Sequence, residues 1–170
     1  MDIRTKAKEG LNRFEKVLDK LPGFKGYFDR ELRRDSDKLQ REFIAGKLET
    51  AKSEMNEIIR NETRKKDLSL LTDFDILLKD IEKIISGIKY SDRGYSGFFD
   101  LIKIKEDTLD KIYEADIALL ETIEVFSKET RLYLEDSIDH KKIQSLVKKL
   151  KDIEKELKIR DEILIGFDKG

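Results

Sequence analysis

Two pairs of glutamates are spaced so that they could hold a divalent cation. Glu54 and Glu57, like Glu121 and Glu124, lie three residues apart, so on a helix both members of a pair would point to one side. Helical di-metal proteins and all-α nucleotide pyrophosphohydrolases use this spacing, because hard cations prefer oxygen ligands. Among 37 acidic residues, however, chance alone gives about eight acidic pairs at any fixed spacing. The pairs leave open a small all-α enzyme acting on a phosphorylated substrate with a divalent cation, but they assign no metal ligand.

Other catalytic chemistries lack the residues they need. The chain has no cysteine, which excludes thiolate metal sites and a thiol nucleophile. Its single histidine, His140, is accompanied by no Gly-x-Ser-x-Gly turn, so we expect no serine triad. A ferritin-like di-iron site needs Glu-x-x-His pairs, and Ser137 stands three residues before His140. We expect His140 to be a solvated side chain, and we expect no catalytic residue, no cofactor and no metal. The sequence favours a protein that is not an enzyme.

The most charged stretch of the chain carries arginines that could bind an anionic partner. It reads DRELRRDSDK at 29–38 and contains Arg30, Arg33 and Arg34, with Arg41 one turn further on. Guanidinium groups suit carboxylate or phosphate groups, but acidic residues in the same stretch stand at spacings that can neutralise them. The four arginines are candidate partner-binding residues, and an ion-paired, solvated helix face is the alternative.

A glycine-rich and aromatic stretch, GYSGFFD at 94–100, offers a second candidate surface. It lacks the third glycine of a dinucleotide fingerprint and the Gly-Lys-Ser/Thr of a phosphate-binding loop, so we expect no nucleotide there. Its aromatic residues Tyr95, Phe98 and Phe99 would either close one end of a helical bundle or form a partner-binding patch.

Asp116 is the acidic residue most clearly placed on an apolar helix face. It shares that face with Ile112 and Leu119, and a buried carboxylate requires a partner. We expect a salt bridge or hydrogen bond to an Arg or Tyr of a neighbouring helix, with Arg33 or Arg34 as the partner. A functional carboxylate is the alternative.

Helices must position all of these residues. The chain has one proline, nine glycines and many Lys, Glu, Leu and Ile residues, a composition typical of helices. Apolar residues recurring every three or four positions predict five helical segments. These segments are 7–21, about 28–62, 70–88, about 106–136, and one from Ser137 or Asp139 onward. A tight connector at 22–27 and a packed loop at 89–105 would separate them.

The second predicted helix changes its apolar register near Gly46. Four apolar residues before this point share one register, and the next five share a register advanced by one residue: Phe28, Leu32, Leu39 and Phe43, then Ile44, Leu48, Ala51, Met55 and Ile58. Such a step predicts a bend, a change of supercoil or a change of packing partner.

These elements predict an all-α fold: an elongated antiparallel bundle of four or five long helices with coiled-coil-like seams, forming a single domain over 1–170. Charged residues make up 43% of the chain, against about 25% in an ordinary domain. Leu, Ile, Val and Phe are nevertheless frequent enough to build a core.

The net charge of −1 conceals an uneven distribution. Residues 1–66 carry 18 basic and 13 acidic side chains, 67–136 carry 9 and 17, and 137–170 carry 9 and 7. The near-neutral total argues against a generic polyanion binder, and we expect no sequence-specific nucleic-acid partner. The basic second helix should lie against the acidic third or fourth helix.

No apolar run is long enough for a transmembrane segment, and the alternating charges at the start do not resemble a signal peptide. We therefore expect a cytoplasmic protein. Peripheral membrane association through the amphipathic first or fifth helix is an alternative.

Four segments resemble an uncharacterised prokaryotic all-helical family of hypothetical proteins: PGFKGY at 22–27, ELRRDSD at 31–37, GYSGFFDLIKI at 94–104 and YEADIALLE at 113–121. The resemblance covers roughly residues 1–165. It implies a helical fold and lends no activity and no catalytic residue. The function expected from the sequence is a non-enzymatic interaction or scaffold protein that binds a protein partner or self-associates, for example by continuing its heptad stripes across a dimer seam.

Overall fold

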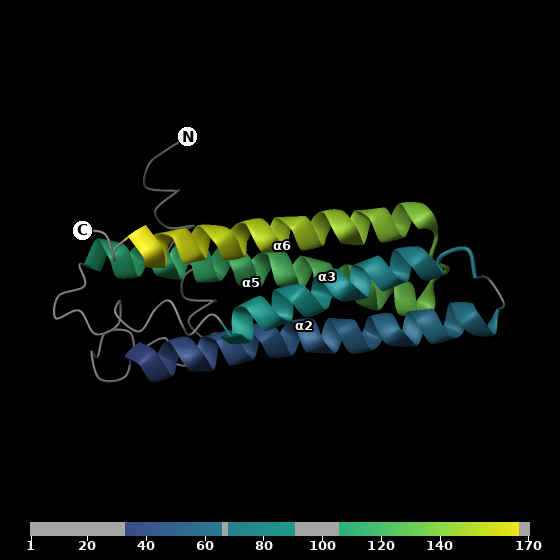
Figure 1. The fold of residues 1–170 in the computed structure, drawn as a ribbon, viewed down its shortest axis with the longest axis horizontal. Coiled ribbons are helices and arrows are strands. Elements are labelled where there is room, and N and C mark those ends of the chain that lie inside the picture. The colour runs from purple at the N-terminus through teal and green to yellow at the C-terminus, as the bar shows by residue number, and fades with distance from the viewer. Residues whose placement is uncertain (1–32, 66–67, 91–105, 167–170) are drawn as a thin grey trace, which may run out of the picture.

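Four long helices make up the described part of the chain. The computed structural model describes residues 33–65, 68–90 and 106–166, without the side chains at 33–37, 106–110, 113 and 164–166. The helices are α2 (Arg33–Arg64), α3 (Leu71–Tyr90), α5 (Glu106–Glu135) and α6 (His140–Gly166) (Figure 1). The all-α class is confirmed.

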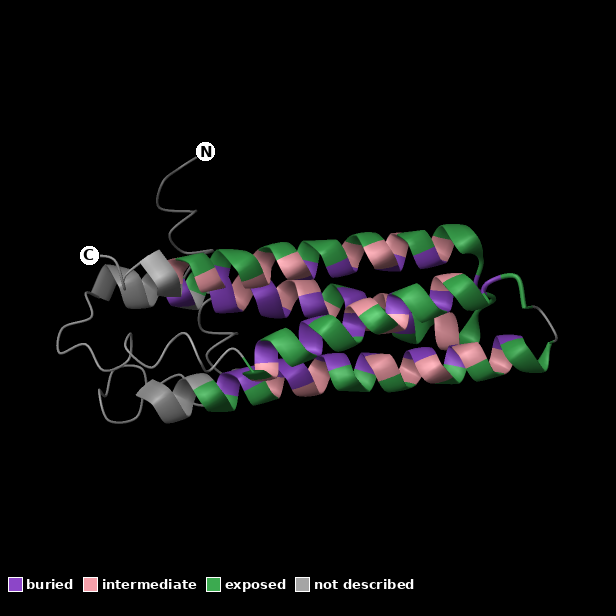
Figure 2. Ribbon diagram, viewed as in Figure 1, coloured by how far each residue is buried: buried purple, intermediate pink, exposed green. Residues whose placement is uncertain are grey.

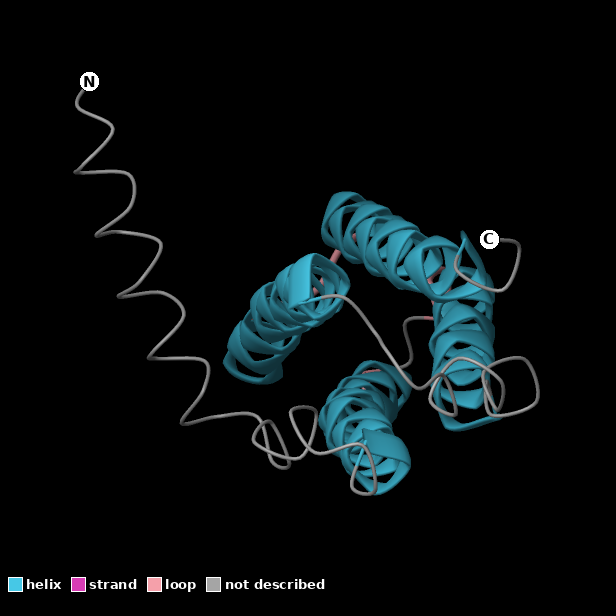
Figure 3. Ribbon diagram, turned by 90° about the vertical axis from the view of Figure 1, so that its left-hand side faces the viewer, coloured by secondary structure: helices cyan, strands magenta, loops and turns pink. Residues whose placement is uncertain are grey.

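The helices form two hairpins that lie side by side. A short connection joins α2 to α3 at one end of the bundle, and a second joins α5 to α6 at the same end (Figure 1). The main contacts join α2 to α3 and α5, and α6 to α3 and α5, so the helices follow one another around the bundle axis as α2, α3, α6, α5 (Figure 3). Within each hairpin the helices are antiparallel, whereas α2 with α5, and α3 with α6, run in the same direction.

The apolar stripes predicted from the sequence line the inside of this bundle (Figure 2). In α3 the buried residues repeat at intervals of three and four, as a helix with one buried face requires. They are Phe74, Leu77, Ile81, Ile84, Ile85 and Ile88. The corresponding residues of α6 are Ile143, Leu146, Leu150 and Ile153. Their burial fixes which face of each helix is left to solvent.

The two apolar registers of α2 are buried to different extents. The second register, from Ile44 onward, is buried in the main core. From the first register, Leu39 is 45% exposed, and Phe43 is half-buried and packs against both the main core and Leu120 of α5. Phe28 and Leu32 lie outside the described residues, so the cause of the register step stays a prediction.

A hydrogen bond marks one helix start, and one boundary differs slightly from the sequence prediction. The Asp139 carboxylate accepts a hydrogen bond from the backbone N–H of Lys142 at 2.8 Å, which makes Asp139 the N-cap of α6. The loop expected from residue 89 begins later, because α3 continues to Tyr90. The predicted segment 7–21, the connector 22–27 and residues 91–105 lie outside the described part of the chain.

Ion pairs cross each of the four main helix contacts. Lys52 of α2 meets Glu82 of α3 at 2.6 Å, and Lys83 of α3 meets Glu154 of α6 at 3.0 Å. The other two contacts contain Glu54 with Arg131, between α2 and α5, and Glu129 with Lys149, between α5 and α6.

The expectation that the second helix lies against the third or fourth is confirmed, because α2 packs against both α3 and α5. The opposite net charges of the regions do not fully explain this packing. Two ion pairs place the acidic partner on α2, since Glu49 pairs with Lys89 and Glu54 with Arg131. Individual pairs alternate in sign along the contacts.

None of the described helices combines the length and apolar character needed to cross a bilayer.

Candidate functional site

Arg41, expected on a partner-binding surface, lies inside the fold. Its side chain is buried, with 4% of the residue exposed. Its Nη1 donates to the backbone carbonyl oxygens of Ile88 at 3.4 Å and Lys89 at 3.1 Å. These carbonyls belong to the last turn of α3, where the helix has no backbone donors for them and its dipole favours a cation. Arg41 thus joins α2 to the end of α3, which corrects the expectation of an exposed anion-binding residue.

The remaining candidate partner-binding residues fall outside the described side chains. Arg33 and Arg34 open α2 without a described side chain, and Arg30 precedes the described residues. Tyr95, Phe98 and Phe99 lie in 91–105, outside the described residues. Their binding role stays a prediction.

Asp116 is buried and paired, as expected for a structural carboxylate. It has no exposed surface, and its Oδ1 accepts a hydrogen bond from Arg160 Nε of α6 at 2.5 Å. The expected class of partner, an arginine of a neighbouring helix, is confirmed. The partner described is Arg160; the side chains of Arg33 and Arg34 are not described, so a contact with either of them stays a prediction. The sequence does contain a signal for the observed pair, because both residues interrupt apolar stripes and lie equally far from Ile138 in the turn between α5 and α6.

The paired glutamates do not assemble a cation site. Glu54 Oε1 accepts from Arg131 Nε at 3.0 Å, and Glu57 is exposed on α2. Among the residues described, no three His, Asp or Glu side chains are grouped closely enough to hold a metal ion. The gathering of Glu54, Glu57, Glu121 and Glu124 that a metal-dependent reaction would need is therefore not observed.

His140 links the first turns of two helices. Its side chain is exposed, as expected, and its Nδ1 lies 2.5 Å from Asp73 Oδ2 of α3. The other ring nitrogen, Nε2, lies 3.0 Å from the Gln144 amide. The histidine thus ties the start of α6 to the start of α3 at the hairpin end of the bundle.

A polar cluster stabilises the contact between α5 and α6 near the same end. The Tyr133 hydroxyl donates to Glu129 Oε1 at 2.7 Å, and Lys149 pairs with the other oxygen of that carboxylate. Burial would raise the pKa of Glu129, but hydrogen bonds from Lys149, Tyr133 and Ser145 lower it overall. Burial and the neighbouring carboxylate raise the pKa of Tyr133 to about 12.

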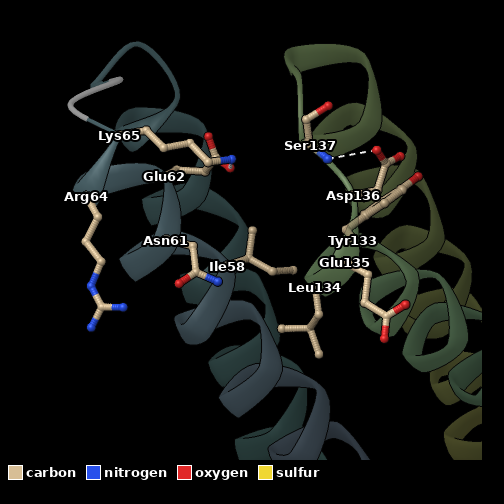
Figure 4. A pocket seen from close by; sticks show the side chains of 10 residues that line it. All are labelled: Ile58, Asn61, Glu62, Arg64, Lys65, Tyr133, Leu134, Glu135, Asp136 and Ser137. Atoms are coloured by element: carbon tan, nitrogen blue, oxygen red, sulfur yellow. Dashed lines mark hydrogen bonds and ion pairs between the residues drawn. The ribbon is translucent and has the colours of Figure 1, made fainter.

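One hollow lies between the last turns of α2 and α5, with a volume of about 360 Å³. Ile58 and Leu134 extend toward each other from the two helices (Figure 4). Several surrounding polar groups bond one another: Lys65 Nζ lies 2.9 Å from Glu62, and Asp136 accepts from the backbone N–H of Ser137. Lys142 and that backbone group lower the pKa of Asp136. These bonds serve the ends of the helices and direct none of the bonded groups at a ligand.

A second hollow, of about 370 Å³, follows the outer side of the contact between α3 and α6. We call it the α3/α6 groove. Its lining residues are Asp73 and Ile76 of α3, and His140, Ile143, Gln144, Val147, Lys148 and Lys151 of α6. Its floor is apolar, and Ile76 stays 49% exposed there.

Only some of the charged residues around the α3/α6 groove have a partner among the described side chains. Asp73 is held by His140 at 2.5 Å. Lys148 and Lys151 are exposed, and among the described side chains neither has an ion-pair partner. The sequence alone does not reveal this groove, because it depends on α3 and α6 being neighbours, which the apolar pattern of a single helix does not show.

No protein-family model, curated protein or solved structure matches this chain. The resemblance to a prokaryotic helical family stays a prediction. The support for a proposed function comes from the geometry of the described helices.

Proposed function

We propose that this protein is a non-enzymatic interaction or scaffold protein whose helical bundle presents the α3/α6 groove to another protein. One observation carries the proposal: Ile76 is 49% exposed beside the apolar floor of a groove whose two rim lysines have no partner among the described side chains. An apolar strip with a polar rim is the usual anatomy of a protein interface.

Several ionisable groups inside the bundle serve the fold. Arg41 binds the carbonyl end of α3, and Asp116 binds Arg160. Glu62 is paired with Lys65. Charged groups held in this way stabilise helix contacts, whereas Lys148 and Lys151 remain available to a partner.

The outer face of α5 is a second exposed surface of lesser weight. Val125 and Leu132 are 54% and 61% exposed, and their spacing of seven residues places them on one side of the helix. Neither residue lines either of the two hollows described above, so the α3/α6 groove remains the stronger candidate.

An enzymatic function has weaker support. It requires glutamates from α2 and α5 to share one pocket, and the described side chains do not form such a group. Release of phosphate from nucleotides or sugar phosphates, measured with and without Mg²⁺ or Mn²⁺, would support an enzymatic function if it depended on the metal.

The apolar stripe of α6 is buried in the core, so in the closed bundle it is not available for membrane association or for a dimer seam. Both roles would use the residues that α6 buries, Ile143, Leu146, Leu150 and Ile153, so either would require the bundle to open. Segment 7–21 lies outside the described residues and remains the proposed route for both roles. Placement in the cytoplasm is part of the proposal and rests on the composition of the sequence.

Photo-crosslinking tests the proposed function. A photo-reactive amino acid is placed at Gln144 in the groove, at Val125 on α5 and at Leu39 on α2, one position at a time, in the full chain. After irradiation in a lysate of the source organism, we expect one recurrent protein adduct from at least one position. Absence of a specific adduct at every position contradicts a protein-binding role.

A further inference from the structure

We propose that the α3/α6 groove binds an amphipathic helix of another protein whose apolar face is flanked by acidic residues. The inference rests on the proposed function and names the partner class of the same surface. Its three supports are the shape of the floor, the charge of the rim and the narrowness of the apolar strip.

The floor has the shape that a docked helix requires. Ile143 and Val147 are four residues apart and share one side of α6, while Ile76 reaches the same hollow from α3. The lining of α6 runs from His140 to Lys151, a length of about 16 Å at the rise of an α-helix. A partner helix with apolar residues at positions i, i+3 or i+4, and i+7 spans about 10 Å and fits within this length.

The rim selects acidic residues on the partner. Lys148 and Lys151 stand three residues apart on α6, both exposed. Among the described lining residues the only acidic side chain is Asp73, which His140 holds at 2.5 Å. Asp152 is exposed on α6 but does not line the groove. A carboxylate beside the apolar face of a bound helix would meet the lysines, and an ammonium group would be repelled.

The narrow apolar strip favours a protein helix over a lipid surface. Ile143 is 1% exposed and forms the floor, Val147 is half-buried, and Ile76 is the lining residue with a large exposed apolar surface. A helix that lies on a membrane needs a broad apolar face to enter the acyl region. A recessed strip accommodates one row of side chains instead.

Two synthetic helical peptides serve as probes. Both carry Leu at positions i, i+3, i+4 and i+7 of a peptide about four helical turns long, with Glu in one and Lys in the other at the flanking positions. Fluorescence anisotropy with the full chain should give an affinity at least about tenfold higher for the Glu peptide, falling as salt rises. Amide shifts in the NMR spectrum should concentrate at Ile76, Gln144 and Val147.

A charge-reversal variant and a matched control locate the binding. The variant is Lys148→Glu with Lys151→Glu, and the control is Lys141→Glu with Lys155→Glu. The control changes the net charge equally on the same helix, at exposed positions that do not line the groove. We expect about tenfold weaker Glu-peptide binding for the groove variant and less than about threefold for the control. Equal thermal unfolding of the two variants shows that the fold is retained, and Ile76→Ser should weaken binding without reversing a charge.

Several results overturn the inference. Equal affinity for both peptides, equal losses in the variant and the control, or amide shifts away from the groove would each do so. Cosedimentation with phosphatidylglycerol vesicles that displaces the Glu peptide would assign the surface to a lipid. If crosslinking finds a partner on another face and the Glu peptide does not bind, the docking inference and the assignment to the α3/α6 groove both fail, while a protein-binding role stands. If neither is found, both fail.

Discussion

Arg160 of α6 and Asp116 of α5 form a hydrogen-bonded ion pair at 2.5 Å, with side chains only 2% and 0% exposed. Both side chains interrupt otherwise apolar stripes. Each charge offsets part of the cost of burying the other, because an unpaired buried charge is costly. The pair therefore fixes how far α6 can slide along α5, in the way that a single buried polar contact sets the register of a coiled coil.

Removing one member of this pair should strongly destabilise the protein. We expect Asp116→Ala to lower the free energy of unfolding by about 3–5 kcal/mol, because it leaves the Arg160 guanidinium buried. The double variant Asp116→Leu with Arg160→Met should lose less than Asp116→Ala alone. Urea unfolding measures both, and Asp75→Ala provides the control, since Asp75 pairs with Lys79 at an exposed position and should cost less than about 1 kcal/mol. A double variant that loses as much stability as Asp116→Ala, or more, would contradict the coupling.

Arg41 should determine the stability of the last turn of α3. Its guanidinium hydrogen bonds to the carbonyls of Ile88 and Lys89 would be lost in Arg41→Leu. We expect a loss of about 1.5–3 kcal/mol, the usual contribution of a charged hydrogen bond. Hydrogen exchange should accelerate first at Ile88, Lys89 and Tyr90, and at the first turn of α3 only through global unfolding. Uniform acceleration along α3 would show that Arg41 acts on the whole bundle.

Gly46 should be replaceable by alanine with a gain in stability. It lies inside α2, and a Cβ atom built there meets no neighbour within 4 Å. Because glycine weakens a helix interior, Gly46→Ala should raise the free energy of unfolding by about 0.5–1 kcal/mol. Gly87→Ala is the comparison: its Cβ would lie at an ordinary contact distance of 3.8 Å from Leu157, close to the end of α3, and should gain less. A loss of stability in Gly46→Ala would mean that the space is occupied.

The fold was accessible from the sequence because each helix carries its own periodic signal. The apolar intervals of α3, from Phe74 to Ile88, reproduce its buried face, and the second apolar register of α2, from Ile44 onward, is buried in the core. A single helix, however, contains no information on which helix lies beside it.

The features that the sequence alone does not predict depend on which helices lie side by side in the bundle. The pairing of Asp116 with Arg160 does not follow from the pattern of either helix, because it depends on the antiparallel contact of α5 with α6. Arg41 was placed on the surface because the position of the α3 end that binds it does not follow from the sequence. The α3/α6 groove could not be predicted for the same reason, since its floor needs Ile76 of one helix beside Val147 of another.

Tyr133 should make the stability of the bundle depend on alkaline pH. Burial and Glu129 raise its pKa from 10.0 to about 12, so the folded state favours the neutral phenol. The contribution is complete below pH 10, because both states are then protonated, and it is lost as pH rises from 10 toward 12, where only the unfolded tyrosine ionises readily. Glu129, whose pKa is lowered, acts at the other extreme: its contribution is present above its ordinary pKa of 4.5 and is lost as pH falls below that value.

The variant Tyr133→Phe isolates the contribution of the tyrosine to the alkaline effect. Urea unfolding at about pH 9.5 and about pH 11.5 should show a larger loss of stability for the wild type than for Tyr133→Phe, because phenylalanine cannot ionise. At about pH 9.5 the variant should be less stable by about 1 kcal/mol, since the hydrogen bond from Tyr133 to Glu129 at 2.7 Å is absent. Identical pH dependence in the two proteins would contradict a raised pKa for Tyr133.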